Sequence, residues 1–145
     1  MEKFNKKKKN NMNLDKTIEK NIYKKHLNNQ SNHWESTFSS RPEMFGHSPS
    51  VAAIKAAEIF KKAGLTNILE LGSGQGRDGI FFAQSDFHLQ VLDYCQSGVD
   101  CIIKKAKTLG LTKHITAKFH DVRNPLPFKD ESFDGCFSHM LYCMA

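Results

Sequence analysis

The stretch that decides the fold is Ile68-Leu69-Glu70-Leu71-Gly72-Ser73-Gly74-Gln75-Gly76-Arg77-Asp78-Gly79. Its apolar first part predicts a buried strand over residues 67–71, and residues 77–84 are predicted to form a helix. The glycines between them allow the backbone to turn sharply and to approach a ligand closely. Free N–H groups at the start of the helix would face that ligand. A strand, a glycine turn and a helix in this order are typical of a nucleotide-binding crevice.

The glycines alone leave two kinds of nucleotide open. Gly74, Gly76 and Gly79 satisfy the GxGxxG spacing of dinucleotide sites, although a single match of this kind is weak evidence. Glu70, two residues before Gly72, distinguishes the two. Its carboxylate would repel a pyrophosphate, whereas it would attract the ammonium and sulfonium groups of S-adenosylmethionine. The position of Glu70 therefore favours a methyl donor over NAD.

Strands and helices alternate along the rest of the chain. A helix is predicted from Pro49, with Ser48 as its cap and Gly64 at its end. The other predicted elements are strands over 89–94, 115–119 and 133–138 and a helix over 97–109. We expect an α/β fold, a Rossmann-like doubly wound parallel sheet with helices on both faces. In such sheets, ligands bind at the carboxyl ends of the strands.

Acidic residues follow two of these predicted strands. Asp93 ends the second strand, where a carboxylate can accept hydrogen bonds from both hydroxyls of a ribose. An acid at this place also occurs in NAD sites, so Asp93 indicates a nucleoside without choosing between the two. The ring of Tyr94 can stack on an adenine, and Asp121, after the third strand, can accept a hydrogen bond from the adenine N6 amine.

These motifs together resemble the class I S-adenosylmethionine-dependent methyltransferases over roughly residues 33–145. Residues 70–76 look like the family's first motif, Asp93 like its ribose-binding acid, and Asp121-Val122 like its adenine-contacting pair. The run Pro-Leu-Pro-Phe-Lys-Asp-Glu-Ser-Phe-Asp at 125–134 is similar to the family's approach to strand four. More narrowly, the segments 45–50, 74–78 and 138–144 resemble small-molecule methyltransferases of the tellurite-resistance and thiopurine type.

The resemblance implies a set of site residues. Gly72, Ser73 and Gly74 would pass along the methionine part of the donor, and Glu70 would hold its amino end. Ser138, together with His139, would lie near the methyl group. The implied cofactor-binding residues are Glu70, Gly72, Ser73, Gly74, Gly76, Asp93, Tyr94, Asp121, Val122 and Ser138. The resemblance implies no metal ligand. Methyl transfer from an activated sulfonium needs a base only when the acceptor has a proton to lose, so no catalytic base is assigned.

The family's sheet has seven strands, whereas this sequence predicts four. We therefore expect a truncated sheet whose fourth strand is an open edge, available to a missing C-terminal half or to self-association. The resemblance implies an enzyme that methylates a small-molecule nucleophile, with this chain supplying the donor-binding half. The alternatives are a non-catalytic S-adenosylmethionine-binding fragment, an NAD-binding module and a nucleic-acid methyltransferase.

Charge is concentrated at the N-terminus. Residues 1–30 contain nine of the 21 basic residues and carry the whole net charge of +6, so residues 31–145 are neutral overall. We expect a disordered Lys/Asn-rich tail over 1–30 and the donor-binding domain over 31–145. A neutral folded part argues against nucleic acid as a partner. No apolar run suits a membrane span or a secretory signal, and four cysteines without a CxxC pair predict reduced thiols in a cytoplasmic protein.

Overall fold

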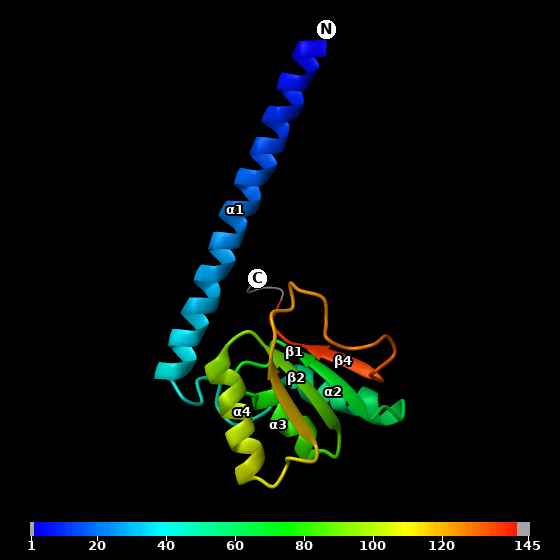
Figure 1. The fold of residues 1–145 in the computed structure, drawn as a ribbon. Helices are drawn as coiled ribbons and strands as arrows, with labels where there is room; N and C mark the ends of the chain where they lie inside the picture. The colour runs from blue at the N-terminus through cyan, green and yellow to red at the C-terminus, as the bar shows by residue number, and fades with distance from the viewer. Residues whose placement is uncertain (1, 142–145) are drawn as a thin grey trace. The chain divides into compact units, whose positions relative to one another are not determined.

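The computed structural model describes residues 2–141, without the side chains of residues 2–15 and 27. Its centre is a parallel four-stranded sheet in the order β3-β2-β1-β4 (Figure 1). The strands are β1 (Asn67–Leu71), β2 (His88–Asp93), β3 (Ile115–Phe119) and β4 (Gly135–Ser138). Strands β2 and β3 follow one another on one side of β1, and β4 lies on the other side of β1. The strand order therefore reverses between β1 and β4, and doubly wound sheets bind ligands at such a switch point.

Three helices pack against one face of the sheet. They are α2 (Val51–Lys62), α3 (Arg77–Gln84) and α4 (Gln96–Thr108). Side chains from all three form one core with alternate strand residues such as Ile68, Val91 and Phe137, around the fully buried Phe82. The parallel sheet and its order agree with the predicted fold class.

The predicted helices on both faces are not found in the described part of the chain. The connections β1–α3–β2 and β2–α4–β3 cross in the same direction, so right-handed crossovers place both helices on one face. The return from β3 to β4, over residues 120–134, contains no helix. The second face therefore carries no helix from residues 51–141.

Helix α2 begins two residues later than the sequence predicted. Ser50, not Ser48, is its N-cap: the Ser50 hydroxyl accepts a hydrogen bond from Ala53 N at 3.0 Å. Ser50 is held there because its own N–H donates to Asp78 Oδ1 at 2.8 Å. Strands β1 and β3 and helix α3 have the predicted bounds, and the remaining strands and helix differ by one or two residues.

The N-terminal segment is helical, whereas the sequence predicted a disordered tail over residues 1–30. Helix α1 spans Glu2–Ser40. This sequence contains no glycine or proline before Pro42, so nothing in it interrupts a helix. Contacts divide the chain into two units, Met1–His33 and Trp34–Ala145. None of the described helices is both long enough and apolar enough to cross a membrane.

Candidate functional site

The glycine turn joins β1 to α3 at the carboxyl edge of the sheet. Gly72, Gly74 and Gly76 have φ angles of 71°, 55° and 82°, a region that other residues rarely adopt. Gly72 N donates to Leu92 O at 2.9 Å, which ties the turn to the end of β2. The start of α4 packs directly on the turn, since a Cβ at Gly98 would lie only 2.4 Å from Gly74 O. The turn is therefore fixed by its own backbone and by its neighbours.

Asp93 holds this turn from the end of β2. Its Oδ2 accepts from Gly74 N at 2.7 Å and its Oδ1 accepts from Cys95 N at 2.8 Å. The side chain is buried, and this burial raises the pKa of Asp93 although the hydrogen bonds from Cys95 and Gly74 oppose the shift. Sequence reasoning placed Asp93 in the site but missed that it organises the glycine turn.

Glu70 is buried between β1 and α3, since a Cβ at Gly79 would lie 2.5 Å from its Oε2. It is 3% exposed, and its Oε2 has no hydrogen-bond partner among the described residues. Burial, followed by the nearby carboxylates of Asp78 and Asp93, raises the pKa of Glu70 to about 8, and Arg77 only partly offsets this. Among the described residues, these carboxylates do not form a group that could hold a metal ion. Glu70 is thus a buried acid whose Oε2 has no partner and which forms no ion pair with any described side chain.

Asp78 connects three segments of the chain. Its Oδ1 and Oδ2 accept from the backbone N and the hydroxyl of Ser50, each at 2.8 Å. The adjacent Arg77 donates to both oxygens, from Nε at 3.0 Å and Nη2 at 3.2 Å. Burial would raise the pKa of Asp78, but the hydrogen bonds from Arg77 and Ser50 outweigh it and the pKa is lowered. His139 Nδ1, after β4, lies 3.6 Å from Asp78 Oδ2.

A segment at the end of α1 covers the glycine turn. Gln75 attaches it: Nε2 donates to Phe38 O at 3.3 Å and to Arg41 O at 2.9 Å, while Oε1 accepts from Met44 N at 2.9 Å. Phe38 packs on the turn, 3.1 Å from where a Cβ of Gly74 would lie. Gln75 is not among the residues predicted for the site, although a polar residue between two glycines of the turn was a usable signal.

The predicted adenine residues gather after β2 and β3. Burial, followed by the charge of Cys95, raises the pKa of Tyr94 to about 12, and Asp121 and Arg123 also act on it. Asp121 accepts from Arg123 N at 3.0 Å and pairs with the Arg123 guanidinium, which lowers the pKa of Asp121. Val122, which follows Asp121 in sequence, is half-buried. The structure therefore brings Tyr94 and Asp121 together, with Asp121 also forming a turn.

Two further predicted residues contribute polar atoms to this edge. Ser73 in the turn and Ser138 at the end of β4 have buried hydroxyls that lack a hydrogen-bond partner within the described chain. Leu71 pairs with Ser138 in the sheet, so the hydroxyls flank the switch point. A buried polar atom without a partner is costly unless a ligand satisfies it. Together with Glu70 Oε2, these atoms fit a polar ligand on the glycine turn.

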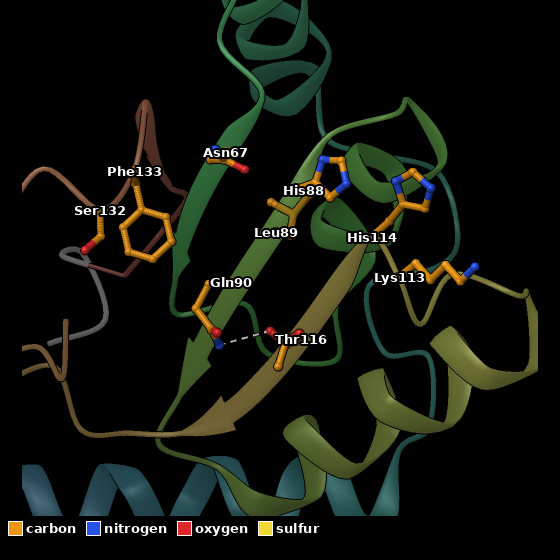
Figure 2. A pocket seen from close by; sticks show the side chains of 9 residues that line it. All are labelled: Asn67, His88, Leu89, Gln90, Lys113, His114, Thr116, Ser132 and Phe133. Carbon is orange, nitrogen blue, oxygen red and sulfur yellow. Dashed lines mark hydrogen bonds between the residues drawn. The ribbon is translucent and has the colours of Figure 1, made fainter. Parts of the chain in front are cut away.

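A separate hollow of about 360 Å³ lies at the other end of the strands (Figure 2). Asn67 and His88, which begin β1 and β2, line it, as does His114 just before β3. The rings of His88 and His114 stack with centroids 5.1 Å apart. None of the predicted site residues lines this hollow, so it is distinct from the glycine turn.

Comparisons with known proteins identify the family of the chain. A protein family described as a methyltransferase domain matches residues 68–145, more than half of the chain. No curated protein sequence matches. An S-adenosyl-L-methionine-dependent methyltransferase structure from Methanococcus maripaludis superposes with a TM-score of 0.56 and 22% identity, covering 82% of this chain and 49% of that one.

Two other solved structures give similar values. One from Aquifex aeolicus, named a SAM-dependent methyltransferase, has a TM-score of 0.52 and 19% identity over 72% of this chain and 55% of that one. One from Galdieria sulphuraria, named a sarcosine dimethylglycine methyltransferase, has a TM-score of 0.55 and 21% identity. That match covers 59% of this chain and 33% of that one. The chain thus spans about a third to a half of these structures. On its sequence match and its fold, the chain belongs to the class I S-adenosylmethionine-dependent methyltransferases.

Proposed function

We propose that this chain binds S-adenosylmethionine on the glycine turn and supplies the donor-binding half of a methyltransferase for a small-molecule nucleophile. The observation that carries the proposal is that β1, the glycine turn after it and the end of the neighbouring β4 each hold a buried polar atom without a partner among the described residues, from Glu70, Ser73 and Ser138. When bound, S-adenosylmethionine supplies a methyl group activated by a positively charged sulfur. The residues of the chain bind, orient and shield this group.

The turn and Glu70 receive the methionine part of the donor. Gly72, Ser73 and Gly74 present backbone without large side chains, and Gly76 closes the turn through its N–H to Ser73 O at 2.9 Å. Glu70 complements the donor's cationic groups. An adjacent cation lowers the pKa of a buried carboxyl, so Glu70 would become ionised on binding.

The nucleoside part lies along the ends of β2 and β3. The Asp93 carboxylate, which accepts from Gly74 N and Cys95 N, would also accept from the ribose hydroxyls. Tyr94, Asp121 and Val122 would surround the adenine. Ser138, at the end of β4, would donate its free hydroxyl near the reacting end of the donor.

A small-molecule acceptor accords with the resemblance and with the neutral charge of residues 31–145. Strand β4 is an edge of the described sheet. We place the surface that completes the acceptor pocket at this edge, contributed by a further C-terminal segment or by a second copy of the chain. The proposed setting is the cytoplasm, in which the thiols of Cys95, Cys101 and Cys136 stay free as the structure has them.

Calorimetry with three ligands tests the proposal on the full chain. We expect S-adenosylmethionine and S-adenosylhomocysteine to bind and NAD to give no saturable signal. The chain has one tryptophan, Trp34, whose ring lies 5.3 Å from that of Phe38, so its fluorescence gives a second readout near the turn. Absence of binding by both methods for both sulfur nucleosides would refute the proposal, and binding without methyl transfer would favour a non-catalytic role.

A further inference from the structure

Arg77 directly follows the glycine turn and begins α3, and its side chain reaches the end of β4. Its Nη2 lies 3.4 Å from Nδ1 of His139, the residue after β4. Because arginine carries only donors, Nη2 donates in this contact and the imidazole accepts. Ser138, just before His139, pairs with Leu71 at the end of β1. The guanidinium therefore lies at the switch point between β1 and β4, where the glycine turn also begins.

The guanidinium of Arg77 is held in one orientation. Nε donates to Asp78 Oδ1 at 3.0 Å, and Nη2 donates to Asp78 Oδ2 at 3.2 Å. The centre of the Phe45 ring lies 5.8 Å from the central carbon of the guanidinium. The side chain of Arg77 is 24% exposed, so solvent and ligands can still reach it. A side chain that is already ordered in this way loses less conformational entropy when it binds a ligand.

The Nη1 end of the guanidinium remains available. A guanidinium has five N–H donors, and the contacts with Asp78 and His139 use the donor on Nε and both donors on Nη2. Nη1 forms no hydrogen bond with any described residue, and it is not among the buried polar atoms. The structure thus presents the two N–H donors of Nη1, on a permanent cation, at the switch point.

The methionine part of S-adenosylmethionine carries a carboxylate as well as an ammonium group. The acids near the turn, such as Glu70, complement the ammonium but not the carboxylate. Lys105 also contacts the turn, but its Nζ already donates to Glu43 Oε2 at 2.9 Å and to Gln75 O at 3.0 Å. Arg77, by contrast, offers a cation with unused donors beside the turn.

We propose that Nη1 of Arg77 binds the carboxylate of the donor's methionine part. This deepens the proposed function and rests on it, because it requires a donor on the glycine turn. Asp78 is the positioning residue, since it holds the guanidinium through Nε and Nη2 and leaves Nη1 for the ligand. Arg77 and Glu70 then recognise the two opposite charges at the amino-acid end of the donor. A nucleoside that lacks the carboxylate should accordingly bind more weakly.

Calorimetry on the full chain with two ligands tests this role of Arg77. The ligands are S-adenosylhomocysteine and S-adenosyl-3-thiopropylamine, which is the same molecule without its carboxylate. The wild type should bind S-adenosylhomocysteine about 10- to 100-fold more tightly, the usual range for a hydrogen bond to a charged group. Arg77→Gln should abolish this preference by weakening S-adenosylhomocysteine alone, because the lost contact involves only the carboxylate. Arg41→Gln, which removes the same charge from an exposed residue, should keep the preference of the wild type.

Three outcomes would count against Arg77, and each is distinct from failure of the proposed function. Equal affinities of the two ligands for the wild type would overturn the proposal without any variant. A preference that persists in Arg77→Gln, or an equal loss for both ligands, would show that Arg77 is merely structural. If circular dichroism shows that Arg77→Gln is unfolded, Arg77→Lys replaces it, and an undiminished preference there would overturn the proposal. If S-adenosylhomocysteine does not bind the wild type at all, the proposed function itself fails.

Discussion

Two aspartates at opposite ends of the strands accept hydrogen bonds from backbone N–H groups, but their pKa values shift in opposite directions. Asp93, at the carboxyl edge, accepts from two backbone N–H groups, of Gly74 and Cys95. Asp134, at the amino edge, accepts from the N–H groups of Thr66 at 3.0 Å and Asn67 at 2.7 Å.

The pKa of Asp93 is raised because the side chain is buried, whereas these hydrogen bonds lower the pKa of the exposed Asp134. The same bonds therefore only fasten the chain at the amino edge. At the carboxyl ends of the strands they also oppose the effect of burial, which disfavours the charged form of Asp93, and they hold the carboxylate where a ligand can reach it.

The largest difference between the two ends of the strands should appear in ligand affinity when each aspartate is replaced. Asp93→Asn should weaken S-adenosylhomocysteine binding by about 10- to 100-fold, since a hydrogen bond to a charged group contributes about 1.5–3 kcal/mol. The matched Asp134→Asn should leave the affinity unchanged. Calorimetry on both variants measures this. Equal affinities for Asp93→Asn and the wild type would remove Asp93 from the site.

Replacing one glycine by alanine at each end of the strands tests how closely the glycine turn is packed. A Cβ at Gly98 would meet Gly74 O at 2.4 Å, whereas at Gly135 it would meet the flexible end of Ile68 at 3.1 Å. Gly98→Ala should cost about 1–3 kcal/mol of stability and should also weaken donor binding. Gly135→Ala should cost less and spare binding. Urea unfolding and calorimetry on both variants check this, and loss of affinity in Gly135→Ala alone would reverse the comparison.

The buried acid at the carboxyl edge predicts a pH dependence of stability. The pKa of Glu70 rises from 4.5 to about 8 on folding, mainly because of burial, with Asp78 and Asp93 adding to it and Arg77 opposing it. The folded chain therefore holds this proton more tightly than the unfolded chain. Its contribution to stability is fully present below pH 4.5 and is lost as the pH rises through about 8.

Glu70→Gln should remove this dependence, because glutamine has no proton to lose. The free energy of unfolding of Glu70→Gln minus that of the wild type should rise between pH 4.5 and 8, with a slope approaching about 1.4 kcal/mol per pH unit. Urea unfolding at several pH values measures it. A difference that stays flat with pH would mean that Glu70 is ionised in the folded chain.

The smallest expected effect concerns the cap of α2. Ser50→Ala removes the hydroxyl that accepts from Ala53 N and should cost about 1 kcal/mol. Ser48→Ala, at the exposed residue that the sequence favoured as the cap, should cost almost nothing. Thermal unfolding of the two variants compares them directly. The larger loss in Ser48→Ala would restore the sequence-based assignment.

Local patterns predicted most of this fold because they act over short distances. The apolar run at 67–71 and the glycines after it depend only on neighbouring residues, and β1 and the turn lie where they were expected. The Ser50 cap was missed because it depends on Asp78, which lies 28 residues away. No sequence period encodes such a contact.

The candidate site shows the same difference between local patterns, which the sequence reveals, and contacts between distant residues, which it does not. Glycine spacing and strand-end acids located the residues of the turn, but the contacts of their side chains required the folded chain. Gln75 reaches Phe38 across 37 residues, and Arg77 reaches His139 across 62. The unpartnered hydroxyls of Ser73 and Ser138 likewise become visible only once the surrounding residues are in place.

Amide chemical shifts during a titration with S-adenosylhomocysteine would locate the donor site on the folded chain. On the ¹⁵N-labelled chain, we predict the largest shifts at the carboxyl edge, in the amides of Gly72, Gly74 and Cys95. The amides of His88 and His114, which line the hollow at the amino edge, should stay within experimental error. Shifts confined to His88 and His114, or no shifts at saturating ligand, would contradict a donor site on the glycine turn.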